Sequence, residues 1–157
     1  MKKRVIRKIK ICLASSSGGH FTQLMKLKFL CEKYNYFFVT IRSTDTNFLL
    51  ENEKVYFVEL PQRRVKPTIL NFLESLAIFL KEKPDLVIST GADATLFISI
   101  ISRIAGKKLI YIETMGRFKR KTLTGKLLYY FSNRFFVQWE SSVKLYGKKA
   151  EYWGSLY

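Results

Sequence analysis

Two turns of small and polar residues carry the groups in this chain that are best suited to chemistry. Residues 15–20 read Ser-Ser-Ser-Gly-Gly-His and residues 90–93 read Thr-Gly-Ala-Asp, and each turn follows a short apolar run. Such turns bring backbone N–H groups to the start of the next helix, where they can hold an anion. His20 is the only histidine in the chain, so it is a candidate for a general base or for a partner of a phosphate or hydroxyl group. A structural turn with a capping histidine would explain the same pattern.

A third turn follows the apolar run at residues 109–112 and reads Glu-Thr-Met-Gly-Arg. Glu113 is the acidic candidate for the same site, although it could instead cap a helix or pair with Arg117. We predict catalytic roles for His20 and Glu113. Contacts to a phosphate or to an acceptor molecule are predicted for Ser16, Ser17, Gly18, Gly19, Thr90, Gly91, Asp93 and Arg117. The three turns form one site only if the apolar runs before them lie side by side.

Short β-rich runs alternate with helical patterns along the chain, and this alternation must position the three turns. Strands are predicted at 9–14, 36–41, 55–59, 86–89, 109–112 and 135–138, with helices near 22–32, 45–50, 67–81, 94–104 and 125–131, and a last helix and strand reach Trp153. Successive strand residues are apolar, as in strands buried on both faces. We therefore predict one α/β domain over residues 1–157, a doubly wound, mostly parallel, Rossmann-like sheet.

Composition narrows the possible functions. The chain has 157 residues, 48% of them hydrophobic, and a formal net charge of +16; this fits a globular domain with an anionic partner rather than a disordered chain. Cys12 and Cys31 lie in apolar runs and are predicted to be buried, reduced thiols. Because the chain has no G-x-G-x-x-G fingerprint, no P-loop and no cluster with metal-ligand spacing, we predict no nicotinamide chemistry, no cofactor and no metal.

Positive charge gathers beside one unusual helix. A basic cluster precedes the helix at 67–81, whose apolar arc is wider than a single core-facing stripe needs. Together they favour contact with an anionic membrane surface, although a helix buried between the sheet and a neighbour would show the same arc. The predicted membrane contacts are Lys2, Lys3, Arg4, Arg63, Arg64, Lys66, Phe72, Leu76 and Phe79. No apolar run approaches the roughly 20 residues of a membrane span, so we expect a peripheral position on the cytoplasmic face of the cell membrane, without a transmembrane segment.

Nucleic acid is the competing explanation for the charge. Aromatic residues make up 15% of the chain, but most of them fall within strand and helix patterns. No RNP-like, KH-like or helix-turn-helix arrangement is present. A basic nucleic-acid-binding domain is therefore the less favoured interpretation, and no nucleic-acid partner is predicted.

Four sequence blocks, taken in order, resemble a known family over essentially the whole chain. They are SSSGGH at 15–20, KPDLVISTGADAT at 83–95, YIETMGR at 111–117 and TLTGKLLYYFSNRFFVQW at 122–139. Their order and spacing are similar to those of the Alg14-like family, which includes the PssD/CpsF-type bacterial polysaccharide proteins and the eukaryotic subunit of the dolichol-linked GlcNAc transferase. More distantly, the first two blocks resemble the amino-terminal domain of MurG-type glycosyltransferases.

The resemblance implies the amino-terminal half of a glycosyltransferase with the GT-B fold. In such enzymes this half takes the lipid-linked acceptor and touches the membrane, and the other half binds most of the nucleotide sugar. We therefore expect a second subunit that carries the UDP-sugar site. The implied reaction transfers a hexosyl or N-acetylhexosaminyl group to a polyprenyl-diphosphate-linked saccharide in capsule or exopolysaccharide assembly, and the chain alone is expected to be inactive or weakly active.

The resemblance also implies roles for single residues. Gly18, Gly19 and His20 match a glycine-rich loop whose histidine is the proposed base, and Glu113 matches the acidic residue after the fifth strand. Partner-interface or cleft positions are implied for Thr124, Lys126, Gln138 and Trp139, although Trp139 could also be a core residue.

The chain departs from the eukaryotic members in one respect. They begin with a membrane-spanning anchor, whereas this chain reaches its first predicted strand at about residue 9. Attachment is therefore expected to be peripheral, through the basic start and the helix at 67–81. The alternative function is a non-catalytic activator or scaffold that docks a catalytic partner at the membrane.

Overall fold

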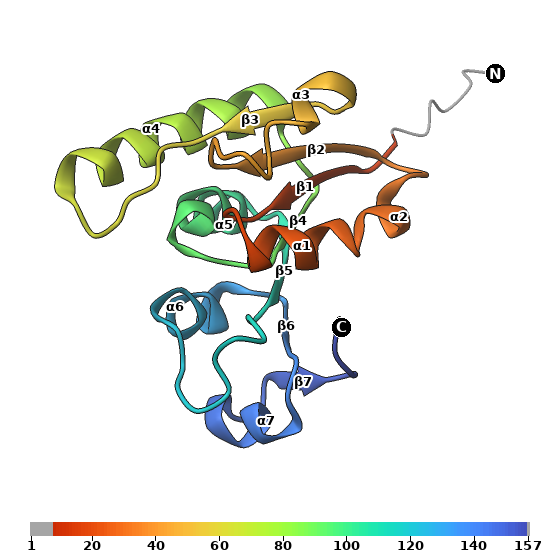
Figure 1. Cartoon of the computed structure of the whole chain (residues 1–157), viewed down its shortest axis with the longest axis vertical. Helices are drawn as coiled ribbons and strands as arrows, with labels where there is room; N and C mark the ends of the chain where they lie inside the picture. Colours follow the sequence, from red (N-terminus) through yellow and green to blue (C-terminus); the bar gives the residue numbers. More distant parts are fainter. Residues whose placement is uncertain (1–7, 157) are drawn as a thin grey trace.

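A computed structural model describes residues 8–156 and contains one seven-stranded sheet (Figure 1). Its strands are β1 (Lys10–Ala14), β2 (Asn35–Thr40), β3 (Val55–Phe57), β4 (Leu86–Ser89), β5 (Lys108–Ile112), β6 (Arg134–Val137) and β7 (Ala150–Tyr152). Their order in the sheet is β3-β2-β1-β4-β5-β6-β7, and every pairing is parallel. The doubly wound, Rossmann-like sheet predicted from the alternation of strands and helices is confirmed.

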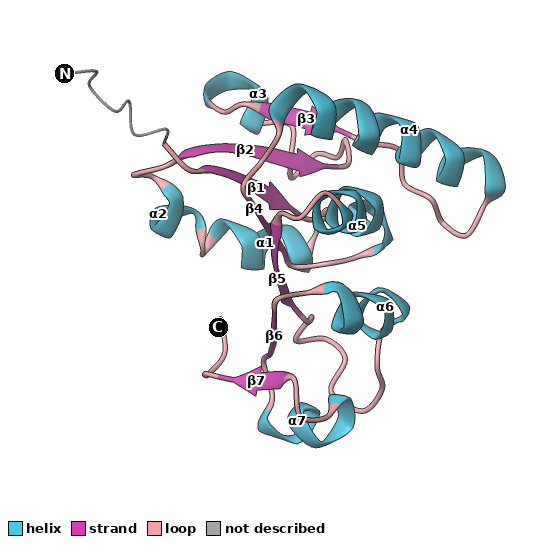
Figure 2. Ribbon diagram, turned by 180° about the vertical axis from the view of Figure 1, so that it is seen from behind, coloured by secondary structure: helices cyan, strands magenta, loops and turns pink. Residues whose placement is uncertain are grey.

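Helices cover both faces of the sheet (Figures 1 and 2). They are α1 (Gly19–Met25), α2 (Lys28–Cys31), α3 (Leu49–Asn52), α4 (Val65–Glu82), α5 (Leu96–Ile104), α6 (Leu123–Phe131) and α7 (Glu140–Tyr146), with a 3₁₀ turn, η1 (Asp93–Thr95), before α5. The core on one face gathers residues of α1, α2 and α3, and the core on the other face gathers residues of α4 to α7.

The central strands supply both cores at once, which explains their unbroken apolar sequence. In β1, Ile11 and Leu13 face the core under α1, whereas Cys12 and Ala14 face the core under α5. All four side chains are at most 3% exposed. Cys12 and Cys31 are free thiols, both buried as predicted, and burial raises the pKa of each of them.

The helices α4, α5 and α6 begin or end within two residues of the predicted bounds. Two other predicted helices differ more, because local hydrogen bonds compete with the helical ladder. The helix expected at 22–32 is divided into α1 and α2, since the N–H of Leu27 bonds to the carbonyl of Leu24 in the tighter 3₁₀ manner. The helix expected at 45–50 is a turn that ends in α3. There the Thr46 hydroxyl donates to the carbonyl oxygen of Ile41 and accepts from the N–H of Ser43.

Candidate functional site

The carboxyl ends of β1, β4 and β5 meet at the centre of the sheet. Strand order reverses between β1 and β4, and parallel pairing sets Ala14 level with Ser89 and Ser89 level with Tyr111. The three predicted turns therefore leave adjacent strands, as the sequence required of a single site. Ligands of doubly wound proteins bind in the crevice at such a reversal.

His20 lies in the first turn of α1 and joins the first two of these turns. Its ring Nδ1 is 2.6 Å from the carbonyl oxygen of Thr90, and the Thr90 hydroxyl donates to the carbonyl oxygen of His20 over 2.7 Å. A carbonyl oxygen only accepts, so Nδ1 carries the proton and Nε2 of the neutral ring keeps its lone pair. Nε2 is therefore the atom that could take a proton from a substrate hydroxyl.

Gly91 allows the ring of His20 to pack against the second turn. Its φ is +95°, a left-handed conformation that favours glycine. A Cβ at this position would lie 3.2 Å from Nδ1 and Cε1 of His20 and also 3.2 Å from the hydroxyl oxygen of Tyr111. The His20 ring and the Tyr111 hydroxyl thus both lie close to Gly91.

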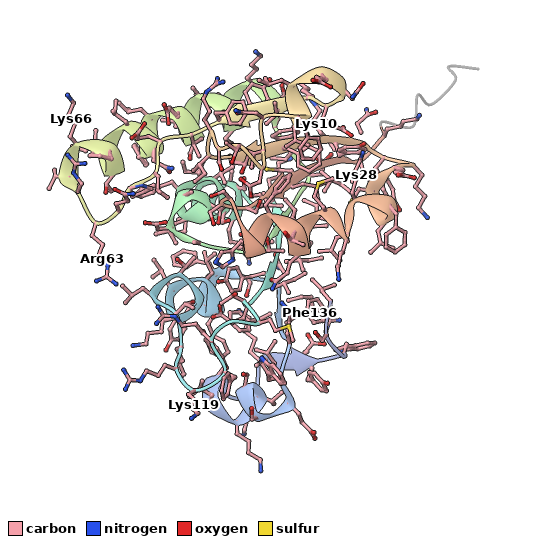
Figure 3. All side chains as sticks on the ribbon, in the orientation of Figure 1. Lys10, Lys28, Arg63, Lys66, Lys119 and Phe136 are labelled. Carbon is pink, nitrogen blue, oxygen red and sulfur yellow. The ribbon has the colours of Figure 1, made fainter. Side chains whose placement is uncertain are left out.

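A cavity of about 1090 Å³ opens beside His20, between the start of α4, α5 and α6. Its rim is cationic, since four basic side chains line it against one acidic side chain: Arg63, Arg117, Lys121 and Lys126 against Asp93. Its wall is largely apolar, formed by Leu96, Phe97, Leu123, Leu127 and Tyr130. Figure 3 shows Arg63 extending from the loop before α4 on this side of the molecule. Such a cavity suits a ligand that joins an anionic group to an apolar chain.

The glycine-rich turn itself does not line this cavity, apart from His20. Ser16 is buried, and its hydroxyl lies 3.4 Å from the carbonyl oxygen of Ser17. The N–H of Gly18 donates to Asp45 Oδ2 over 2.6 Å, so a carboxylate of this chain occupies that donor. Hydrogen bonds from the Ser43 hydroxyl and from Gly18, partly opposed by burial, hold the pKa of Asp45 below its usual range. The predicted phosphate contacts of this turn stay predictions.

Asp45 is a residue that the sequence did not single out, because nothing in its local pattern shows that the loop after β2 reaches the turn after β1.

The second turn, at residues 90–93, contains residues that contact His20 or line the cavity. Thr90 and Gly91 hold His20, and Asp93 lines the cavity while its Oδ2 accepts from the N–H of Gln62 over 3.1 Å.

Glu113 lies behind the cavity wall and is 2% exposed. Its Oε1 accepts from the N–H of Thr114 at 2.8 Å and from the Tyr111 hydroxyl at 3.4 Å. Its Oε2 accepts from the hydroxyls of Thr122, at 2.8 Å, and of Tyr146. Burial, together with the nearby Glu113 carboxylate, raises the pKa of both tyrosines. Arg117 lines the cavity and is not among the partners of Glu113 in residues 8–156, so the ion pair considered from the sequence is absent there.

The four remaining cleft or interface candidates divide into two pairs. Thr124 and Lys126 stand on α6 and line the cavity. Gln138 is buried, and its side chain makes hydrogen bonds within the protein. Its Nε2 donates to Gln23 Oε1 at 2.9 Å and to the carbonyl oxygen of Glu113 at 3.0 Å. Trp139 is 40% exposed, and its indole N–H donates to the carbonyl oxygen of Met115 at 2.9 Å. Trp139 is thus held at the surface beside the third turn rather than in the core.

Helix α4 buries three polar side chains and only one apolar side chain, Ile78, and it exposes most of its large apolar side chains. Asn71 and Ser75 are fully buried, and Asn71 Nδ2 donates to the carbonyl oxygen of Ala94 at 3.0 Å. Six large apolar side chains of α4 are at least 40% exposed: Val65, Ile69, Leu70, Phe72, Leu73 and Leu80. This arrangement reverses the usual polarity of a surface helix. The wide apolar arc seen in the sequence is therefore not a buried arc.

The predicted membrane contacts fall into three groups. Arg63, Arg64 and Lys66 are exposed at the start of α4, where Figure 3 shows Lys66 pointing outward, and Phe72 is 40% exposed. Leu76 is half-buried, and Phe79 packs partly against the core. Lys2, Lys3 and Arg4 lie outside the described residues.

Residues 8–156 contain neither a cluster of metal-binding side chains nor a helix that could cross a membrane. No group of three or more histidine, cysteine, aspartate or glutamate side chains is placed to hold a metal ion. None of the helices in this part of the chain combines the length and the hydrophobicity that crossing a membrane would require.

Solved structures share this fold at low sequence identity. UDP-N-acetylglucosamine 2-epimerase from Rickettsia bellii matches 96% of the chain with a TM-score of 0.76 and 14% identity. MurG from Acinetobacter baumannii matches 95% with a TM-score of 0.72 and 12% identity. The chain spans only 46% and 45% of these two proteins, so the likeness concerns less than half of each.

Curated relatives match the chain along most of its length. A protein of Candida albicans named UDP-N-acetylglucosamine transferase subunit ALG14 is 27% identical, and the alignment covers 99% of this chain and 81% of the relative. The human protein of the same name is 26% identical, with 89% and 80% covered. The family model described as oligosaccharide biosynthesis protein Alg14 like matches residues 11–156. This match covers nearly the whole chain, which therefore belongs to the Alg14-like family.

Proposed function

We propose that this chain is the acceptor-side, membrane-associated subunit of a two-chain UDP-sugar glycosyltransferase. The observation that carries the proposal is the cavity beside His20. There a histidine nitrogen that can accept a proton, a cationic rim and an apolar wall belong to one concave surface. A polyprenyl-diphosphate-linked saccharide needs all three, for its reacting hydroxyl, its diphosphate and its lipid chain.

In the proposed reaction, a hydroxyl of the acceptor saccharide attacks the anomeric carbon of the UDP-sugar. The new bond joins the acceptor oxygen to that carbon, the bond from the carbon to the diphosphate breaks, and UDP leaves. His20 Nε2 takes the hydroxyl proton, and Nδ1 stays bonded to Thr90 so that the ring keeps its orientation. Arg63, Arg117, Lys121 and Lys126 hold the acceptor diphosphate.

The donor site is proposed to come from a second subunit. The described residues form a single sheet, and the relatives of Candida albicans and human are named as transferase subunits. The carboxyl edge of the sheet, where the cavity opens, is the side from which the donor half would approach.

Membrane contact is proposed to occur through the outer face of α4. Exposed apolar side chains there lie next to exposed Arg63, Arg64 and Lys66, a combination that suits anionic headgroups above acyl chains. This placement would hold the cavity beside the lipid carrier on the cytoplasmic side. Capsule or exopolysaccharide assembly is the setting that we propose, on the resemblance to the bacterial PssD/CpsF-type proteins.

A non-catalytic scaffold is the second candidate. The observation that favours it is the paired hydrogen bonding of His20 and Thr90, which would tie two turns together even without any chemistry. The effect of replacing His20 on the assembled enzyme separates the two candidates.

The proposal is tested by purifying the tagged chain from its native cells in mild detergent and identifying the proteins that remain bound. We expect a second Rossmann-like chain, and we expect the purified pair to move sugar from a UDP-sugar to a polyprenyl-diphosphate-linked saccharide. A purified pair without this activity would overturn the proposal. So would recovery of nucleic acid alone, if the affinity of the chain for that nucleic acid falls steeply as the salt concentration rises.

A further inference from the structure

The carboxylate of Glu113 is the centre of a hydrogen-bonded cluster that builds one wall of the cavity. Of its four donors, Thr114, Thr122 and Tyr111 line the cavity, whereas Tyr146 on α7 lies behind it. Glu113 itself is not among the cavity-lining residues. Within residues 8–156 no lysine or arginine pairs with it. The four partners of its side chain are hydrogen-bond donors of the surrounding wall, which suits a structural anchor better than a group that contacts substrate.

Each oxygen of the Glu113 carboxylate accepts two hydrogen bonds. Oε1 accepts from the backbone N–H of Thr114 and from the Tyr111 hydroxyl, and Oε2 accepts from the hydroxyls of Thr122 and Tyr146. Thr122 in turn accepts from the N–H of Gly125 at 2.8 Å and so caps the amino end of α6. The carboxylate therefore fixes β5, the turn after it and the start of α6 against one another.

Tyr111 is the residue through which this cluster reaches the reacting atoms. Tyr111 is only 1% exposed, yet it lines the cavity. A Cβ added at Gly91 would lie 3.2 Å from the Tyr111 hydroxyl oxygen and also 3.2 Å from the His20 ring, so the two groups are close to each other. Because the Tyr111 O–H donates to Glu113, its oxygen has lone pairs left to accept a hydrogen bond from a ligand.

We propose that Glu113 is a positioning residue that orients the Tyr111 hydroxyl, and that the Tyr111 oxygen accepts a hydrogen bond from a hydroxyl of the acceptor saccharide beside His20. This inference rests on the proposed function for the identity of the saccharide. It replaces the catalytic role predicted for Glu113 with an indirect one, and it adds Tyr111 to the residues that touch the acceptor.

Glutamine at position 113 is the informative substitution because it keeps the size of the side chain. The N–H of Thr114 can only donate, so the amide oxygen must take the place of Oε1. The amide NH₂ then faces Thr122 and Tyr146. Both of those oxygens already accept a backbone N–H, from Gly125 and from Thr122 respectively. Glu113→Gln should therefore loosen the wall, whereas Tyr111→Phe removes one hydroxyl and keeps the ring packing.

A matched control exists at the opposite edge of the sheet. There the Tyr56 hydroxyl donates to the buried Glu82 over 2.5 Å, again a hydrogen bond from a tyrosine to a glutamate but away from the cavity; unlike Glu113, Glu82 also forms ion pairs with Lys10 and Lys54. Tyr56→Phe and Glu82→Gln thus repeat the two changes where only folding stability should respond.

The first measurement uses the isolated full chain with isotope-labelled histidine. His20 gives the only histidine signal, and we expect Tyr111→Phe and Glu113→Gln to shift its Cε1–H resonance while Tyr56→Phe and Glu82→Gln leave it in place. The second uses the assembled pair. We expect Tyr111→Phe to lower kcat/KM for the lipid-linked acceptor about three- to tenfold, with KM for the nucleotide sugar unchanged.

Unchanged His20 resonances and unchanged acceptor kinetics in Tyr111→Phe would overturn the inference. If Glu113→Gln does not fold, Tyr111→Phe still decides the outcome. Failure of the proposed function looks different: the wild-type pair then transfers no sugar, while the resonance measurement still reports whether Tyr111 and Glu113 set the surroundings of His20.

Discussion

His20 and Thr90 hold each other from both sides. The His20 ring donates through Nδ1 to the carbonyl oxygen of Thr90 at 2.6 Å, and the Thr90 hydroxyl donates to the carbonyl oxygen of His20 at 2.7 Å. Two turns that are 70 residues apart in sequence therefore fix the ring and direct its second nitrogen away from Thr90. A base in this position has its tautomer and its orientation set before substrate arrives.

Replacing His20 by glutamine should abolish most of the activity of the assembled pair. The glutamine amide can still donate to Thr90, but it cannot take a proton, so we expect kcat to fall on the order of 100-fold or more. The measurement is sugar transfer by the reconstituted pair at saturating substrates. Co-purification of the partner and a thermal midpoint within a few degrees of wild type would confirm intact folding. Activity close to wild type would favour the scaffold function.

The cationic rim should govern affinity for the lipid-linked acceptor. Arg117 and Lys126 are exposed and line the cavity, and removal of both should raise KM for the diphosphate-linked saccharide about tenfold or more, since charge-assisted hydrogen bonds to phosphate are strong. KM for the UDP-sugar should stay unchanged. A double replacement of the exposed Lys33 and Lys144, which do not line the cavity, serves as the control. An equal effect of the control pair would point to general charge instead.

Binding to anionic vesicles should depend on the outer face of α4. Val65, Ile69 and Leu73 are 78%, 54% and 52% exposed, so their replacement by serine should leave the fold intact and weaken vesicle binding about tenfold or more. Sedimentation with vesicles containing phosphatidylglycerol measures this. Serine at Phe29, Leu30 and Ile104, which are 66%, 53% and 75% exposed, is the matched control and should bind like wild type. Equal loss in both variants would contradict a specific role for α4.

Gly125 should not tolerate alanine. A Cβ there would overlap Oε2 of Glu113 and the Tyr146 hydroxyl, and it would lie 2.7 Å from Thr122 Oγ1. All three belong to the hydrogen-bonded cluster around Glu113, so we expect a loss of about 2–4 kcal/mol in the free energy of unfolding. Urea unfolding measures it. Gly19→Ala is the control because no atom lies within 4 Å of a Cβ at that position. A fully stable Gly125→Ala would mean that the cluster can rearrange.

The free energy of unfolding should decrease at acidic pH because Glu82 takes up a proton. Burial alone would raise the pKa of this side chain, but hydrogen bonds from Lys54, Tyr56 and Lys10 outweigh burial and lower the pKa from 4.5 to about 2. A lowered pKa in the folded state gives stability that is present above pH 4.5 and is lost as pH falls from 4.5 toward 2. The contribution is up to about 3 kcal/mol.

Glu82→Gln is the variant that tests this pH dependence. Urea unfolding of wild type and variant should show the larger difference at pH 5 and a smaller one near pH 2.5. A difference that does not change with pH would contradict the assignment.

The local sequence pattern predicted most of the fold, but it did not predict which residues form the wall of the cavity. Strands such as Leu86–Ser89 were predicted at their observed bounds, because a run of apolar residues between turn residues leaves few alternatives. His20, Thr90 and Gly91 could be chosen as candidates from the sequence because glycine turns after such strands mark the carboxyl edge of the sheet.

The remaining site residues depend on tertiary contacts that no local pattern records. Tyr111 looks like any aromatic residue in a buried strand, and only the folded structure shows that it lines the cavity with its hydroxyl close to Gly91. Asp45 reaches Gly18 from a loop 27 residues away. Glu113 was noticed, but its position behind the wall follows from the packing of α6 and α7.

The reversed polarity of α4 has a consequence for how the chain behaves at high concentration. With a net charge of +16, copies of the chain repel one another at low ionic strength and keep their apolar α4 faces apart. Salt shortens the range of that repulsion to about 10 Å at 0.1 M, while apolar attraction is not weakened. Adding salt should therefore drive the purified chain to self-associate through α4, so that its solubility falls under the conditions that usually protect a basic protein.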